Sequence, residues 1–230
     1  MVLPPADARL RLRISAVSGR VTVTAEARGD VVVERGGVTS AAADGAVEIR
    51  GDKPSDAVVV RCPAASDVVV GTRSGSVELE GRFGTVGVTS QSGSIRVAEA
   101  SEADLRTVSG VVELGACAGR CRVSTTSGRI DVGATRDAEI STTSGSVGLD
   151  DVTGTVQARS VSGSVRIASA ANGPITVHTV SGSITIHLPE GVRPTVRASG
   201  HGKLRNSFEA GDDVVVEVAN VSGRVKLLPA

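Results

Sequence analysis

The sequence predicts an all-β protein folded as a single-stranded β-solenoid (β-helix) with coils of about 17 to 18 residues. Three observations predict it. A Ser-Gly pair recurs at nearly constant spacing, aliphatic and polar residues alternate after each pair, and aromatic residues are almost absent. A fixed short period is typical of architectures in which each coil contacts only its neighbours.

The Ser-Gly pair recurs seven times, with its glycines 18, 17, 18, 17, 18 and 19 residues apart. These glycines are Gly75, Gly93, Gly110, Gly128, Gly145, Gly163 and Gly182. Two apolar columns follow, separated by one polar residue, which is the period of a half-buried strand. The first is Val77, Ile95, Val112, Ile130, Val147, Val165, Ile184, and the second is Leu79, Val97, Leu114, Val132, Leu149, Ile167, Ile186.

A second strand precedes each pair and has its own inward columns. They read Val86, Ala103, Cys121, Ala138, Val156, Ile175 and Val88, Leu105, Val123, Ile140, Ala158, Val177. We therefore expect two or three short strands per coil and right-handed winding.

Small hydroxyl residues continue the inward parity of this second strand towards the corner. They are Ser90, Thr107, Thr125, Thr142, Ser160 and Thr179, and the serine of each Ser-Gly pair has the same parity. Strict alternation predicts that both hydroxyls in each coil point inward and stack, while the glycine relieves the turn. This favours a structural role over a modification site.

The polar column between the two apolar ones begins with Glu78, Arg96 and Glu113. Neighbouring strands lie about 4.7 to 4.9 Å apart, so these three side chains should form a surface ladder of alternating charge. Such pairs add little stability singly and mainly favour the correct register.

The repeat is irregular at both ends. Residues 1–64 should form an amino-terminal β region, either the first coils or a cap, with strands near 21–23, 31–33, 46–49 and 57–60. Residues 65–230 should form the solenoid, with an irregular segment at 201–221 that is either an insertion or a terminal hairpin.

Composition argues against several classes of partner. Lys plus Arg and Asp plus Glu both total 25, and Trp and Tyr are absent, so we expect no nucleic-acid partner. The prolines at 4 and 5 and the alternating pattern up to Ile14 do not suit a signal peptide, and no stretch is long enough for a membrane segment. Three cysteines form no disulfide framework, so the expected location is cytoplasmic.

No catalytic constellation is visible. The histidines at 178, 187 and 201 are scattered, and Cys117 and Cys121 lack further ligands for zinc. Neither a nucleophile elbow nor a phosphate-binding loop is present. We therefore expect no catalytic residues, cofactor or metal site.

The pattern Ser-Gly-Ser-Val/Ile-x-Val/Leu, preceded by Thr-Val-Ser-Gly or Thr-Thr-Ser-Gly, resembles the bacterial putative-adhesin family of β-strand-repeat proteins. The resemblance covers about residues 65–190, and Val221 to Val225 looks like the family's last repeat. It implies a β-solenoid domain of unknown function, with no assigned catalytic residues.

The sequence thus predicts a non-enzymatic scaffold or protein-interaction module of a bacterial cell, with an unidentified protein partner. One alternative is a self-assembling cytoskeletal filament, in which solenoid ends stack as in bactofilin-like proteins. Another is an enzyme acting on a polysaccharide in a surface groove. The expected state is a monomer or an end-to-end assembly.

Overall fold

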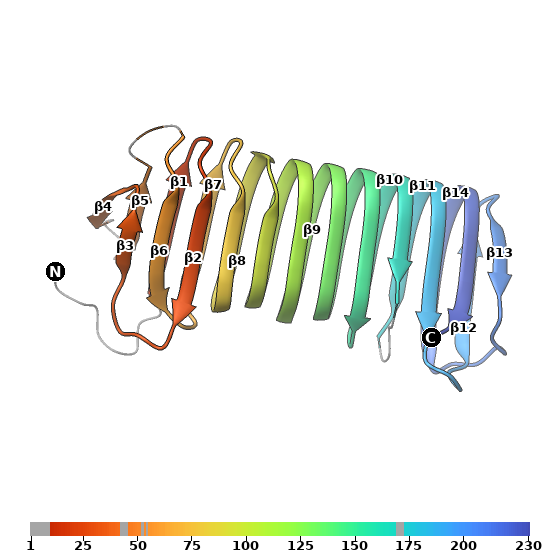
Figure 1. Ribbon diagram of the computed structural model, residues 1–230. Coiled ribbons are helices and arrows are strands. Elements are labelled where there is room, and N and C mark those ends of the chain that lie inside the picture. Colours follow the sequence, from red (N-terminus) through yellow and green to blue (C-terminus); the bar gives the residue numbers. More distant parts are fainter. Residues whose placement is uncertain (1–9, 42–45, 52, 54, 169–172) are drawn as a thin grey trace. The chain divides into compact units, whose positions relative to one another are not determined.

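The computed structural model describes residues 10–41, 46–51, 53, 55–168 and 173–230. These residues form strands and connections without any helix, so this part of the chain contains no helix that could cross a membrane. Two compact units divide at Ala116 and Cys117, and we call them unit 1 and unit 2. The chain winds in successive coils within each unit, which confirms the all-β solenoid (Figure 1).

Unit 1 is a mainly parallel stack. Its strands are β1 (Arg11–Ala16), β2 (Val21–Glu26), β3 (Val32–Arg35), β4 (Val38–Ala41), β5 (Val47–Arg50), β6 (Val58–Pro63), β7 (Asp67–Thr72), β8 (Val77–Ser92) and the first part of β9 (Ile95–Val152). β1 lies between β5 and β7, and β2 lies between β6 and β8, so the first coil in sequence is inserted between two later coils. β3 and β4 close this stack by antiparallel pairing with β6 and β5.

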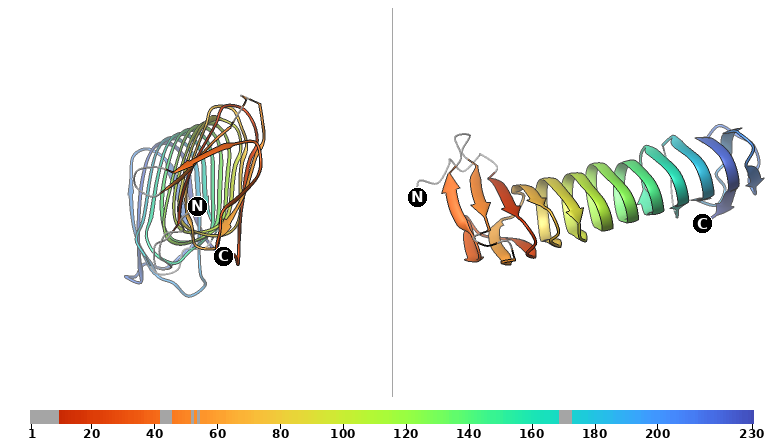
Figure 2. Two further views of the ribbon diagram at one scale, coloured as in Figure 1. Left: turned by 90° about the vertical axis from the view of Figure 1, so that its left-hand side faces the viewer. Right: turned by 90° about the horizontal axis from the view of Figure 1, so that it is seen from above.

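Unit 2 is parallel throughout its described pairs. After the remainder of β9 it contains β10 (Val156–Ile167), β11 (Ile175–Leu188), β12 (Pro194–Ser199), β13 (Lys203–Asn206) and β14 (Val214–Pro229). β14, the last strand in sequence, pairs with β11 on one side and with both β12 and β13 on the other. Figure 2 shows the coils of this unit following one another in register.

All four apolar columns are buried, as predicted. Every described member is at most 4% exposed, from Val77 and Leu79 in unit 1 to Ile184 and Ile186 in unit 2. Cys121 is fully buried among these aliphatic residues and packs as a small hydrophobic side chain.

The ladder hydrogen bonds continue around the corners of the regular coils. The short strands expected from the sequence therefore merge into longer ones, and β9 alone extends over 58 residues. The amino-terminal strands lie close to their expected positions, while the first nine residues, with both prolines, lie outside the described residues. The proposed division at residue 64 stays a prediction.

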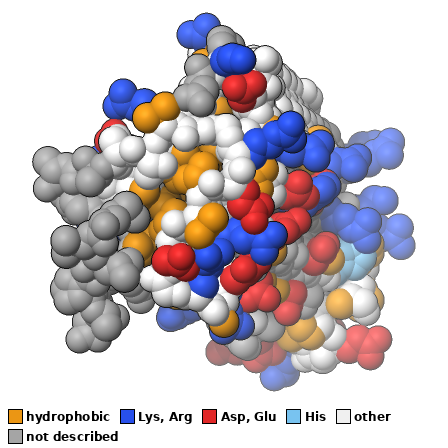
Figure 3. Space-filling model, turned by 60° about the vertical axis from the view of Figure 1, so that its left-hand side comes forward, with side chains coloured by type: hydrophobic (Ala, Val, Ile, Leu, Met, Phe, Trp, Pro, Cys, Tyr) orange, Lys and Arg blue, Asp and Glu red, His pale blue; other side chains and the backbone are white. Residues whose placement is uncertain are grey.

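The predicted charge ladder is present in unit 1. Arg96 Nε lies 2.7 Å from Glu113 Oε2, and Arg96 Nη1 lies 3.7 Å from Glu78 Oε1. The hydrogen bond that Arg96 donates to the Glu113 carboxylate is the main cause that raises the pKa of Arg96. Basic and acidic side chains also lie next to each other over the surface seen in Figure 3.

The prediction for the Ser-Gly serine was wrong. The preceding hydroxyl residues, such as Thr107 and Ser160, are buried as expected, but the Ser-Gly serines, such as Ser109 and Ser162, are exposed. Alternation fails at the corner because two consecutive residues point outward there. The serine hydroxyls consequently line the outside of each coil.

The glycine of the pair reverses the backbone at this corner. Gly163 and Gly182 have φ values of +146° and +148°, a region that residues with a Cβ rarely adopt. A Cβ on Gly182 would also meet the carbonyl oxygen of Gly163 in the previous coil. Glycine is thus required by both conformation and close stacking.

Candidate functional site: a groove in unit 2

A groove of about 440 Å³ crosses successive coils of unit 2. It lies beside the corner, where residues two apart on one strand both point outward and form two parallel rows. One row is polar in the middle and the other is mainly apolar. The rows are Ser141, Arg159, His178, Ala219 and Thr143, Val161, Val180, Val221.

The apolar row owes its position to strand register. Ser162 pairs with Ser181, which pairs with Ser222, so the preceding residues Val161, Val180 and Val221 are successive members of one column. Their exposed fractions are 49%, 49% and 58%. Exposed apolar residues in a contiguous row are a feature of interaction sites rather than of inert surface.

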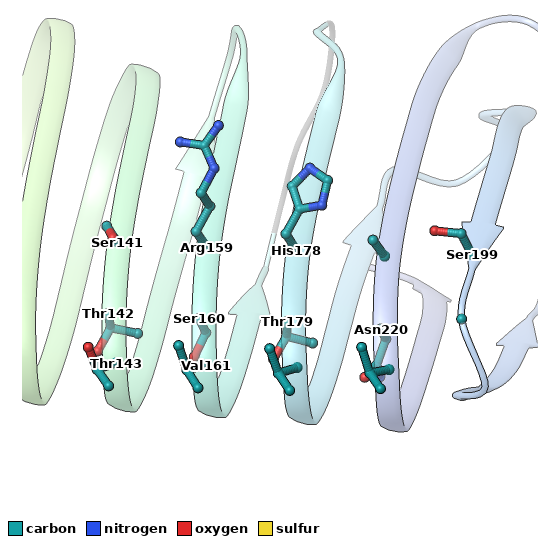
Figure 4. Close-up of a pocket in the computed structure, with 14 residues that line it drawn as sticks. Ser141, Thr142, Thr143, Arg159, Ser160, Val161, His178, Thr179, Ser199 and Asn220 are labelled. Atoms are coloured by element: carbon teal, nitrogen blue, oxygen red, sulfur yellow. The ribbon is translucent and has the colours of Figure 1, made fainter.

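The polar row places Arg159 beside His178, because these two residues are register partners on β10 and β11. Figure 4 shows both side chains extending from neighbouring coils on the same side of the groove. Neither forms an ion pair with a carboxylate in the described part of the chain. The groove lining contains no aspartate or glutamate, so His178 has no carboxylate within the groove to orient it as a general base.

Beneath the groove lies the inward row of polar side chains at the corner. Thr179 Oγ1 donates to the carbonyl of Ser181 at 3.5 Å, whereas Thr142 and Ser160 have hydroxyls without a hydrogen-bond partner among the described residues. Hydroxyls therefore stack inward, but no hydrogen bond from one hydroxyl of this row to the next is described.

Asn220 replaces the hydroxyl residue in β14. Its side chain is 2% exposed, and neither Oδ1 nor Nδ2 has a hydrogen-bond partner in the described structure. Gly200 and Gly202 lie against it, and a Cβ on Gly202 would contact the Asn220 amide. The last inserted strand therefore carries an unsatisfied amide where the regular coils carry a hydroxyl.

A second groove of about 330 Å³ contains the acidic residues that the first lacks. It is lined by Arg120, Asp137, Ala138, Glu139, Thr155 and Gln157. Asp137 Oδ1 accepts the backbone N–H of Thr155 at 2.9 Å, and Glu139 accepts from Arg122 at 2.7 Å. Both carboxylates thus stabilise the contact between neighbouring coils, which is a structural use.

The other titratable candidates are also structural or isolated. His187 Nδ1 lies 3.1 Å from the carbonyl oxygen of Pro229, and His201 is exposed in the connection before β13. Burial raises the pKa of the Cys62 thiol to about 11 and that of Cys121 to about 12, so neither is a nucleophile at neutral pH. Within the described residues, no three His, Cys, Asp or Glu side chains group to hold a metal ion.

The groove was not predicted from the sequence. The feature that could have indicated it is the valine of the Thr-Val-Ser-Gly motif, which lies on the outer side of the corner. Strict alternation assigns that valine outward, but it gives no reason to treat one outward residue per coil as a surface row. The pairing register of β10, β11 and β14 brings the valines together.

Fold and groove define a class of protein: a β-solenoid domain whose surface features repeat from coil to coil. The chain belongs to the Toastrack DUF4097 family, which matches residues 2–227, and this confirms the resemblance seen in the sequence. The family is a domain of unknown function and supplies no site residues.

Comparisons with curated proteins and with solved structures do not indicate a function for the chain. No curated protein matches the chain. A crystal structure of "a putative cell adhesion protein from Clostridium sporogenes ATCC 15579" is 9% identical, with 100% of this chain and 96% of that chain covered and a TM-score of 0.31. A similarity at this score carries no argument about the present chain.

Proposed function

We propose that the chain is a non-enzymatic β-solenoid module that binds another protein through the groove of unit 2. One observation supports this most directly: the exposed valines at 161, 180 and 221 form one wall of a groove that has no carboxylate in its lining. A partner could bury these valines at about 25 cal/mol per Å² of apolar surface. The groove offers repeated contacts rather than convergent reactive groups.

We also propose a cytoplasmic location. All three cysteines are buried free thiols, which suits a reducing compartment. The filament alternative receives less support, because the edge strand β13 carries Lys203 and Arg205, and these charges oppose pairing with any edge that does not offer free carboxylates.

Comparative capture from a lysate of the native cells tests the binding function. Immobilised wild type should retain a partner that Val161→Asp/Val180→Asp loses, and Arg166→Asp, on a different outward column, should retain it. Equal capture by all three proteins would overturn the proposal. Turnover of a polysaccharide that His178→Ala abolishes would overturn it in favour of the enzyme alternative.

A further inference from the structure

Strand β13 presents a free edge in unit 2. Among the described strands it pairs with β14 alone, and Figure 1 shows it on the side of β14 away from β11. All four of its residues are exposed, and Leu204 retains 43% of its accessible surface although it is the register partner of buried Val225. The unpaired N–H and C=O groups of such an edge can accept an additional strand.

Four cations surround this edge without compensation. Lys203 pairs in register with Arg224, and Arg205 pairs with Lys226, so like charges lie directly opposite one another on neighbouring strands. None of the four forms an ion pair with a carboxylate in the described residues. Like charges placed directly opposite destabilise a sheet.

Other cations of the same region are neutralised. Arg193 Nε lies 3.9 Å from Asp213 Oδ2, and Arg197 Nη1 lies 3.0 Å from Glu217 Oε1 on the neighbouring strand. The sequence therefore does place carboxylates opposite arginines at this end of unit 2. Among the described residues no such pair forms at Lys203, Arg205, Arg224 or Lys226, which leaves four positive charges available to an external anion.

We propose that β13 is a docking edge for an extended acidic segment of a partner protein, added as a further strand. Residues two apart on that segment would lie opposite Lys203 and Arg205 and should be acidic. The residue between them would lie on the side of Leu204 and should be apolar. The expected recognition element is acid, apolar, acid. This inference rests on the proposed function as a binding module and adds the chemistry of the partner.

A second copy of this chain suits the edge less well. The free strands at the other chain end, β3 and β4 of unit 1, offer Glu34, but its carboxylate already lies 2.7 Å from Arg61 Nε. Val38, Thr39 and Ser40 of β4 are uncharged. A non-peptide polyanion would use the cations but neither the backbone edge nor Leu204.

The test measures binding by fluorescence anisotropy. The probe is a labelled peptide with the sequence Ser-Glu-Val-Glu-Thr, and the control probe is Ser-Glu-Glu-Val-Thr, which has the same composition and charge. Lys203→Glu/Arg205→Glu should weaken binding of the first probe about tenfold, the equivalent of two opposite-charge cross-strand pairs. Arg120→Glu/Arg166→Glu makes the same charge change on exposed positions of unit 2 that lie outside the groove, and it should leave the affinity within about twofold.

Several outcomes would overturn the docking edge. They are no saturable binding of the first probe, equal binding of the two peptides, equal weakening by both double variants, and displacement by a single-stranded DNA oligomer more readily than by unlabelled peptide. Val161→Asp/Val180→Asp should leave probe binding unchanged, because the groove is a separate surface. If the probe fails while groove-dependent capture persists, the docking edge is wrong and the proposed function stands.

Discussion

The first coil of unit 1 and the last coil of unit 2 are both inserted between other coils, but the strands that close the two stacks differ. Each chain end is inserted into its stack: β1 and β2 lie between later strands, and β14 lies between earlier ones. The closing strands differ. Those of unit 1 pair antiparallel, whereas β12 and β13 of unit 2 pair parallel.

Charge separates the two regions further. Arg61 of unit 1 lies 2.9 Å from Glu26 and 2.7 Å from Glu34, so the closing strand β3 is held by a compensated cluster. In unit 2, Lys203 and Arg205 face other cations. A compensated cluster thus holds the closing strand β3 of unit 1, whereas the cations of β13 have no carboxylate partner among the described residues, as the proposed docking edge requires.

The largest expected loss of stability follows from placing a charge on the buried side of the inserted strands β2 and β14. Val23 and Val216 are fully buried, and each has a register partner on both neighbouring strands. Val23→Asp and Val216→Asp should each cost more than about 3 kcal/mol, because an unpaired charge would be buried in the core. Circular dichroism melts should show loss of folding. Arg166→Asp is the control and should melt like wild type.

A tolerated Val216→Asp would show that the inserted strand of unit 2 is not part of its core. The two chain ends would then differ in construction as well as in charge.

Alkaline pH should weaken unit 1 through Cys62, which lies on β6 next to the inserted β2. Its folded pKa is about 11, against an ordinary value of 9.0. Below pH 9 the thiol is protonated in both states and contributes no pH dependence. Between pH 9 and 11 the unfolded state loses the proton first, so stability should fall as pH rises.

Thermal melts between pH 8 and pH 11 check this prediction. The chain has no tyrosine, so few other groups titrate in the same range. Cys62→Ala should flatten the fall, and Cys121→Ala should remove a separate contribution from unit 2. An unchanged slope in Cys62→Ala would show that this thiol is as exposed as in the unfolded chain.

The regular coils were predictable from sequence because each inward column repeats the same physical requirement. Columns such as that of Val147 and Val165 follow from period-two alternation alone. The exposed serine at 162 was not predicted, because a corner turned by Gly163 breaks that alternation. The insertion of β14 also escaped prediction, since its Ser-Gly motif at 222 shows membership of a coil but not the position of that coil in the stack.

Removing Arg61 should produce a smaller loss in unit 1. Arg61→Gln leaves Glu26 and Glu34 without their shared cation. These side chains are partly exposed, so we expect a cost of about 1 kcal/mol and a melting temperature about 2 to 4 °C lower. Arg50→Gln, which removes only the exposed contact with Glu48, is the matched control and should change little. Equal melts for the two variants would show that the cluster does not hold β3.

The smallest expected change in the free energy of unfolding is a gain, whereas the three changes above are losses. Lys203→Glu/Arg205→Glu converts two like-charge pairs with Arg224 and Lys226 into opposite-charge pairs. We expect a gain of about 0.2 to 1 kcal/mol per pair, measured as a higher melting temperature at low salt that declines towards wild type in 1 M salt. Lys203→Gln/Arg205→Gln should give a smaller gain, because it removes repulsion without adding attraction. A loss of stability in both variants would mean that these cations already contribute to the fold, and the contrast with the compensated Arg61 cluster would then fail. A gain would identify β13 as a strand whose charges are retained at the expense of stability, as expected for a binding edge.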